Sequence, residues 1–231
     1  MAKRRAAMLR LPNSTGIKGA SMGEVRDSDA SIDALSDEFY RQMHEALRGR
    51  LPKKSRFRHS IGVAKQSEEL AEIYGADVRK ARLAGLLHDW DKGYDDEGIR
   101  VRAEELGLRF DPFLLEHMPQ LLHGPTAAQA LALEFPQIPP DVLSAIERHT
   151  AGAVGMSDLD MIVYIADVIE PHRDFDGVDK LRELVGAKPL EELFIDVSAH
   201  VLGNLVDRHR FIHPETLKVW NYYLMRQKRS S

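Results

Sequence analysis

Apolar residues recur about every 3.6 positions from Ile32 to near the end of the chain, and no segment alternates with a period of two. This pattern predicts one amphipathic helix after another and no strands. Gly75, Gly93, Gly107 and Pro136 are typical of the breaks between them. The predicted helices span 32–49, 56–74, 77–90, 95–106, 112–122, 125–134, 139–150, 157–170, 177–185, 189–209 and 213–227.

Several helix starts carry the residues that favour them. Asp77 and Ser157 stand where an N-cap side chain is expected, and Asp141 falls in a first turn, where a carboxylate suits the helix dipole. No internal repeat and no Gly- or Pro-rich linker divides residues 31–231. We therefore expect a single all-α domain over 31–231.

The first 30 residues have a different composition. Lys3-Arg4-Arg5 is followed by a Pro, Ser and Gly-containing stretch without an apolar segment, which excludes a signal peptide. The acids Glu24, Asp27 and Asp29 disfavour an organelle transit peptide. Low hydrophobicity predicts that residues 1–30 form a disordered N-terminal tail.

Composition excludes several classes of protein. The 231 residues carry a formal net charge of -4, which gives no general affinity for nucleic acid. There is no cysteine, so disulfides and thiolate zinc sites are excluded, and the chain suits a reducing cytoplasm. No apolar run reaches the roughly 20 residues that span a bilayer. We expect a cytoplasmic protein that binds neither nucleic acid nor membrane.

Histidines and aspartates recur at positions that the apolar pattern predicts to be buried. A single buried histidine is usually a hydrogen-bonded core residue, but six such groups would need six separate partners. Shared metal ions would satisfy all of them, whereas uncompensated buried charges cost several kcal/mol each. The six candidate ligands are His59, His88, Asp89, His123, His149 and Asp167.

The types of ligand restrict the metal. Four imidazoles and two carboxylates without a thiolate favour iron, manganese, cobalt, nickel or zinc over magnesium or calcium. Six ligands suit two ions better than one catalytic ion with an open position, and Asp89, directly after His88, is the expected bridge. A water bridging two cations loses its proton near neutral pH, so such a centre would supply a hydroxide that can attack the phosphorus of a phosphoanhydride, if that is the substrate.

Nearby cations are candidates for phosphate binding. Lys92 follows His88 by one turn, and its alternative is a solvated lysine at a helix end. Arg173 follows Asp167 beyond Pro171 and has the fork geometry for a phosphate; otherwise it is a surface arginine paired with a neighbouring aspartate, Asp174 or Asp176. Thr150 and His172 are weaker candidates for phosphate contact.

The order of the six candidate ligands resembles that of the HD phosphohydrolase superfamily in its dinuclear form. Longer motifs are similar to the YqeK-type branch of symmetrical bis(5'-nucleosyl)-tetraphosphatases, over roughly residues 40–185. These motifs are Arg56-Phe57-x-His59-Ser60-x-Gly62-Val63, Leu122-His123-Gly124-Pro125, His149-Thr150-x-Gly152, the stretch from Met156 to Arg173 and Phe175-x-Gly177-Val178.

This resemblance implies an HD helical bundle with a dinuclear, iron-dependent centre that cleaves diadenosine tetraphosphate into two ADP. The cofactors would be two divalent or mixed-valence ions held by the six residues above. Asp89 and Lys92 would be catalytic, and the substrate-binding residues would be Lys92, Arg173, Thr150 and His172. The expected partner is a small dinucleoside polyphosphate, and a homodimer is compatible with the sequence.

Two alternatives remain at this level. One is another HD phosphohydrolase, such as a nucleotidase or an alarmone hydrolase, and the other is a catalytically silent nucleotide-binding module. Asp91 departs from the expected pattern by adding a carboxylate near the metals, unless it faces solvent and pairs with Lys92. Trp90 is expected in the core. The final helices, which carry Phe194, Val197, Val201, Leu205, Trp220 and Tyr223, are expected to pack internally or to form a dimer surface.

Overall fold

The structure, a computed structural model, describes residues 33–230, and within this range every regular element is helical. The prediction of an all-α fold is confirmed. The predicted tail, 1–30, lies outside the described residues, and the single domain over 31–231 stays a prediction. The elements are α1 Asp37–Arg50, α2 Lys54–Tyr74, α3 Val78–Leu87, α4 Asp96–Glu105, α5 Pro112–His117, the 3-10 helix η1 Pro119–Leu122, α6 His123–Glu134, α7 Pro140–Arg148, α8 Asp158–Ile169, α9 Val178–Glu183, α10 Leu190–Asp207 and α11 Pro214–Ser230.

One predicted helix, 112–122, is divided. The chain leaves α-helical geometry at Met118, and Pro119 then begins the short helix η1. Proline has no backbone N–H and restricts the residue before it, so the α-helix ends there. Helix α6 begins at His123, two residues before Pro125, and the break brings His123 to a helix N-terminus.

The predicted caps form as expected. The Asp77 carboxylate accepts hydrogen bonds from the backbone N–H groups of Arg79 and Lys80. At the start of α8, the Ser157 side chain accepts from the Asp160 backbone, and the Asp160 carboxylate accepts from the Ser157 backbone. This capping box fixes the first turn of the most apolar helix in the sequence.

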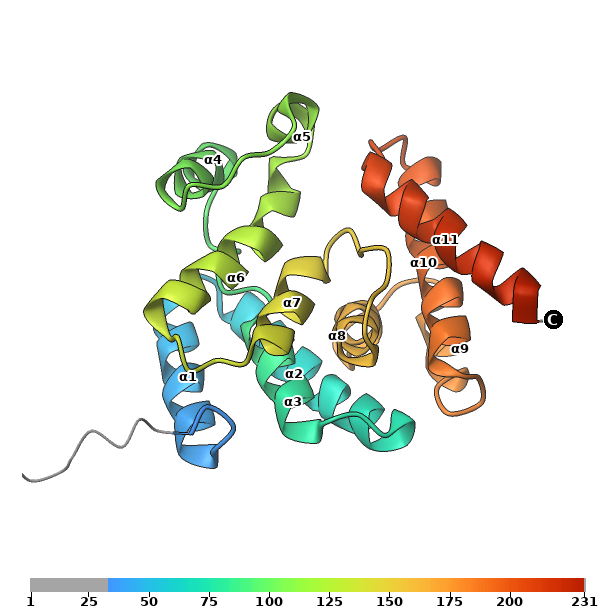
Figure 1. The fold of residues 1–231 in the computed structure, drawn as a ribbon, viewed down its shortest axis with the longest axis horizontal. Coiled ribbons are helices and arrows are strands. Elements are labelled where there is room, and N and C mark those ends of the chain that lie inside the picture. The colour runs from blue at the N-terminus through green and yellow to red at the C-terminus, as the bar shows by residue number, and fades with distance from the viewer. Residues whose placement is uncertain (1–32, 231) are drawn as a thin grey trace, which may run out of the picture. The chain divides into compact units, whose positions relative to one another are not determined.

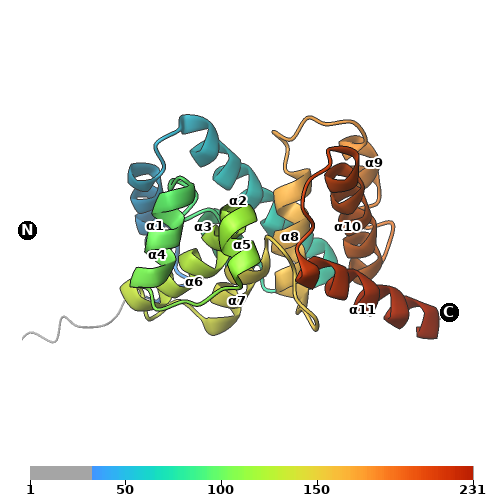
Figure 2. The same ribbon diagram turned by 90° about the horizontal axis from the view of Figure 1, so that it is seen from above.

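Helix α8 lies between two groups of helices, with α2, α3 and α7 on one side and α9 and α10 on the other (Figures 1 and 2). Its apolar residues are buried around nearly the whole circumference, which is why its sequence shows no polar face. Asp167 is near the C-terminal end of this helix. Asp167 lies close to His88 and His149, which directly follow the C-terminal ends of α3 and α7.

The close approach of α6 to α7 depends on Gly124. A Cβ atom at this position would lie 2.8 Å from the Glu147 carbonyl oxygen and 3.2 Å from that of Ile146. Both are backbone atoms of α7 that cannot move without displacing the helix. Because Gly124 has no side chain, His123 beside it comes within contact of His149.

The final helices pack internally. Phe194 and Val197 of α10 and Tyr223 of α11 are buried, and the Tyr223 hydroxyl accepts a 2.8 Å hydrogen bond from the Met156 backbone. The flanking residues Val201, Leu205 and Trp220 are partly exposed. No helix of the described residues is long and apolar enough to cross a membrane.

Candidate metal centre

Six side chains from five parts of the fold converge on one point in the interior. His59 is on α2, His88 and Asp89 directly follow α3, and His123 begins α6; His149 follows α7 and Asp167 is on α8. Three overlapping sets have ligand atoms that lie within 4.8 Å of one another. These sets are His59, His88 and Asp89; His88, His149 and Asp167; and Asp89, His123 and His149.

Three of the imidazoles are oriented by hydrogen bonds to nearby backbone carbonyl groups. The Nδ1 atoms of His88, His123 and His149 lie 2.7, 2.5 and 2.7 Å from the carbonyl oxygens of the residues three positions earlier, Gly85, Gln120 and Ile146. A carbonyl only accepts, so each Nδ1 must donate. The proton is thereby fixed on Nδ1, and each Nε2 presents its lone pair to the centre.

The fourth imidazole is oriented by a carboxylate. His59 Nδ1 lies 3.0 Å from Glu170 Oε1, while its Nε2 lies 2.9 Å from Asp167 Oδ1. An imidazole that donates to a carboxylate on one side and faces the centre on the other is typical of metal-ligating histidines. A Cβ atom on Gly62 would collide with the Glu170 carboxylate, so glycine at this position lets Glu170 reach α2.

Two observations indicate that this donor set fits a cation. His88 Nε2 is fully buried and has no hydrogen-bond partner among the described residues. His123 Nε2 and His149 Nε2 face one another at 3.0 Å, yet both rings use their protons on Nδ1. Two lone pairs at this distance repel unless a positive charge lies beside them; Lys92 Nζ, 3.2 Å from His123 Nε2, supplies one such charge, and a divalent metal ion bound by both rings would supply another.

The protonation states agree with this arrangement. Burial lowers the pKa of His88 and, together with the nearby imidazoles, holds that of His149 well below its usual range, which favours the neutral form that metal ligation requires. Burial opposes ionisation of Asp89, but His88 and His123 outweigh it and hold the pKa of this carboxyl well below its usual range. Asp167 behaves likewise, since hydrogen bonding from His59 and the charges of nearby groups overcome the effect of burial on its pKa.

A cavity of about 300 Å³ opens from this cluster and is lined by cations. Lys92, Arg56 and Arg173 contribute to its wall, with His59, Asp89 and Asp167 beneath them. Lys92 Nζ lies 3.2 Å from His123 Nε2, and burial lowers the pKa of this lysine against the opposing charges of Asp89 and Asp167. The cavity therefore combines metal-type ligands with groups that bind phosphate oxygens.

Arg173 does not pair with a neighbouring aspartate in sequence. Its guanidinium donates to Asp167 Oδ1 at 2.6 Å and to the Asp167 carbonyl oxygen at 2.9 Å, which ties the loop after α8 to a candidate ligand. Its side chain remains 42% exposed, so one edge of the guanidinium is open to the cavity.

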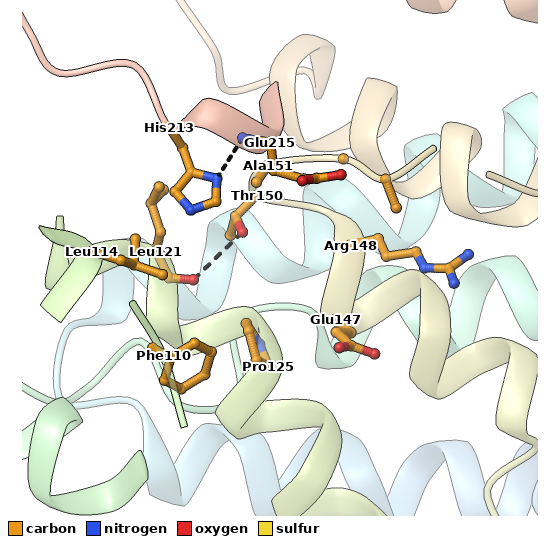
Figure 3. A pocket seen from close by; sticks show the side chains of 12 residues that line it. Phe110, Leu114, Leu121, Pro125, Glu147, Arg148, Thr150, Ala151, His213 and Glu215 are labelled. Carbon is orange, nitrogen blue, oxygen red and sulfur yellow. Dashed lines mark hydrogen bonds between the residues drawn. The ribbon is translucent and has the colours of Figure 1, made fainter. Parts of the chain in front are cut away.

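The expected substrate contacts of Thr150 and His172 are not seen in this cavity. Thr150 lines a separate cavity (Figure 3), and its hydroxyl donates to the Leu121 carbonyl oxygen at 3.5 Å. His172 Nδ1 lies 2.9 Å from Glu170 Oε2, and its backbone N–H donates to the same oxygen. His172 thus contacts the group that orients His59, outside the wall of the candidate site.

Asp91 lies away from the centre, so both expectations for it are wrong. It is buried, with Oδ1 2.5 Å from Arg50 Nη2 and Oδ2 3.4 Å from Arg102 Nε. Successive residues in the turn after α3 point in different directions, and Asp91 points toward α1 and α4 while Asp89 points inward. The Arg50 guanidinium also lies over the Trp90 ring, which is buried in the core as expected.

Two contributors were missed at the level of sequence. Arg56 precedes His59 by one helical turn and shares its face, a spacing that is visible in the sequence. The second is Glu170, whose carboxylate contacts the imidazoles of His59 and His172. That contact joins residues 111 positions apart, and no local pattern reveals it.

Several known proteins are similar to this chain in sequence. The model of the HD domain family matches residues 56–172, which contain all six candidate ligands. The symmetrical bis(5'-nucleosyl)-tetraphosphatase of Halalkalibacterium halodurans is 36% identical over 173 residues, covering 75% of this chain and 91% of that protein. Its counterpart in Bacillus subtilis is 34% identical over 168 residues, covering 72% of this chain and 88% of that protein.

A solved structure is similar over most of this chain. A crystal structure from Clostridium acetobutylicum, described as a predicted HD superfamily hydrolase involved in NAD metabolism, has a TM-score of 0.74 and 36% identity. It covers 81% of this chain and 97% of its own. The convergence of the histidines and aspartates, the family match and these relatives agree: the chain belongs to the HD domain family, in the group of the symmetrical bis(5'-nucleosyl)-tetraphosphatases.

Proposed function

We propose that this protein hydrolyses diadenosine tetraphosphate symmetrically into two molecules of ADP. The observation that carries the proposal is the cluster of inward-facing Nε2 atoms and carboxylates beneath a cavity lined by cations. The similarity to the bis(5'-nucleosyl)-tetraphosphatases over most of their length supports this choice of substrate.

The metal would be held by the six candidate ligands, His59, His88, Asp89, His123, His149 and Asp167. When bound, two such ions supply an activated nucleophile and neutralise charge on the phosphoryl oxygens. The donor set of imidazoles and carboxylates suits iron, with manganese, cobalt, nickel and zinc as alternatives. We propose iron, and a cytoplasmic location and a homodimer remain predictions.

The chain itself binds and orients the substrate. Arg56, Lys92 and Arg173 place three cationic side chains on one cavity, which matches the charge of a tetraphosphate. Lys92, whose ammonium is held against His123, is placed to donate a hydrogen bond to a phosphate oxygen as charge develops in the transition state. The ADP leaving group needs no strong acid, so positioning and charge account for most of this contribution.

Product analysis tests the proposal. Anaerobically purified, metal-replete protein should convert diadenosine tetraphosphate to ADP alone, and elemental analysis should find iron. A His149→Ala preparation, purified identically, is the control for contaminating activity. ATP together with AMP would indicate asymmetric cleavage, and absence of turnover would indicate a silent binding module; either result contradicts the proposal.

A further inference from the structure

A second cavity adjoins the candidate site at Arg173. It has a volume of about 330 Å³ and lies between the end of α8, the loop that follows and the outer face of α10. Arg173 lines both this cavity and the one above the metal-type ligands. The two spaces therefore meet at a guanidinium, and each is at the lower end of the size range of ligand pockets.

One face of α10 supplies much of the wall. His200, Asn204 and Arg208 occur at intervals of four and form a single row along the helix. Val201 and Leu205 form the adjacent row. The wall thus presents an imidazole, a carboxamide and a guanidinium beside an apolar strip, and these groups suit a heterocyclic base better than a simple anion.

The aromatic part of the wall comes from the loop after α8. The Phe175 ring stacks on the His200 ring, with centroids 4.7 Å apart and an interplanar angle of 26°. Phe175 belongs to the Phe175-x-Gly177-Val178 motif, which the metal centre does not use. Aromatic and imidazole faces of this kind stack nucleobases, and an asparagine carboxamide matches the hydrogen-bonding edge of adenine.

The charge of the cavity agrees with a nucleotide. Its lining includes two guanidinium groups, Arg173 and Arg208, and no carboxylate. Among the described residues, the Arg208 side chain has no ion-pair partner. A cation without a partner on the wall of a pocket is available to a phosphate or to the face of a base.

The cavity of Figure 3 is less suited to this ligand. It has a similar volume, about 370 Å³, and an aromatic residue, Phe110. However, two carboxylates, Glu147 and Glu215, line it. It shares no lining residue with the cavity above the metal-type ligands.

We infer that the cavity between α8 and α10 binds one nucleoside of the dinucleoside polyphosphate, with the base against Phe175 and His200 and the phosphates passing Arg173 toward the metal centre. This inference rests on the proposed function for the identity of the whole substrate. Phe175, Asn204 and Arg208 are thereby assigned to nucleoside recognition and take no part in the chemistry.

The test compares two ligands that differ only by the nucleoside. Dissociation constants for ADP and for inorganic pyrophosphate are measured by calorimetry on metal-loaded protein. Phe175→Leu should weaken ADP binding about tenfold, the scale of lost base stacking, and leave pyrophosphate binding unchanged. Asn204→Ala, at an exposed position, should weaken ADP binding about two- to tenfold.

Phe110→Leu is the matched control, because it makes the same change at a partly buried phenylalanine in the other cavity. Arg210→Ala is the control for loss of an exposed charge beyond α10. Neither control should alter ADP binding. In steady-state assays, Phe175→Leu should raise the KM for diadenosine tetraphosphate more than it lowers kcat.

Three outcomes would overturn the inference. These are unchanged ADP binding and KM in both cavity variants, an equal loss of ADP and pyrophosphate binding, and an effect of Phe110→Leu in place of Phe175→Leu. If wild-type protein fails to turn over diadenosine tetraphosphate, the proposed function fails, but the ratio of ADP to pyrophosphate affinity still decides the nucleoside site.

Discussion

In the candidate site, hydrogen-bond partners determine which ring nitrogen of each histidine carries the proton. Each imidazole uses Nδ1 to donate to a fixed acceptor, either a carbonyl oxygen three residues earlier or the Glu170 carboxylate. In His88, His123 and His149 this leaves Nε2 without a proton in the interior, whereas His59 Nε2 lies 2.9 Å from Asp167 Oδ1. Such outer contacts fix the tautomer and ring orientation of a metal ligand and raise its basicity.

Removal of Asp89 should abolish metal binding and turnover together. Asp89 belongs to two of the three ligand sets and contacts His123 Nε2 at 3.2 Å. We expect Asp89→Ala to lose more than about 100-fold in kcat/KM, beyond the effect of an outer-shell partner. Elemental analysis and the ADP assay measure the two effects. Asp176→Ala, at an exposed position, is the control, and full metal content with full activity in Asp89→Ala would contradict the role of Asp89.

Lys92 should affect turnover without affecting the metal. Lys92→Met keeps most of the side chain but removes the ammonium beside His123. Loss of a charged hydrogen bond predicts a fall in kcat of about 10- to 100-fold, with metal content unchanged. Lys65→Met removes an exposed lysine on α2 and should have no effect. An unchanged kcat for Lys92→Met would show that Lys92 has no part in catalysis.

At the scale of elements, the sequence predicts the helices better than their contacts. The periodicity predicts each helix, and Ser157 and Asp77 form the caps expected of them. The division of the predicted helix 112–122 was not predicted, because the apolar periodicity continues across Pro119, the one residue that marks the break. Convergence of the six side chains was inferable from the need to compensate buried polar groups. The partners of Glu170 and Asp91 were not, because they come from distant helices.

The approach of α8 to α2 should depend on Gly62. In Gly62→Ala the new methyl group would collide with the Glu170 carboxylate, displacing it from His59. We expect metal affinity to fall about 10- to 100-fold, as for loss of an outer-shell partner. Gly203→Ala on α10 is the matched control, since no atom lies within 4 Å of its Cβ position, and it should stabilise the protein by about 0.5–1 kcal/mol. Metal titration and thermal unfolding of both variants check this, and equal metal affinities would contradict it.

At the scale of the whole molecule, the centre joins helices that are distant in sequence. Removal of the metal leaves neutral imidazoles and carboxylates packed together in the interior, and binding free energy to the folded state adds to its stability. Chelation should therefore lower the unfolding temperature of the entire protein, in addition to its activity.

The metal-free protein should become less stable as the pH falls below about 6.5, the ordinary histidine pKa. The pKa values of His88 and His149 are lowered in the folded state, so the unfolded chain binds more protons in this range. His59 acts oppositely: its pKa is raised, and the stability it contributes is lost as the pH rises through the folded-state value. Because the pKa of His149 is lowered strongly, its effect should outweigh that of His59, and the protein should lose stability as the pH falls.

Thermal unfolding of chelator-treated protein between pH 7.5 and 5 measures this effect. His149→Asn should flatten the dependence, since the most strongly shifted imidazole is removed. If the unfolding temperature of the wild-type protein stays constant or rises toward pH 5, the rings of His88 and His149 become protonated in the folded state without destabilising it, and the prediction is wrong.

The carbonyl contacts of His88, His123 and His149 have a consequence for metal selection. Each ring is locked by the turn that precedes it, so the apoprotein resembles a rigid chelator that loads without refolding. The intrinsic affinity of nitrogen and oxygen donors for divalent ions follows the Irving–Williams order, so the ion that is bound depends on the fixed geometry of the site and on which metals are available. The ion carried by a given preparation will therefore reflect cellular supply during synthesis, and growth media differing in trace metals should yield proteins of differing occupancy.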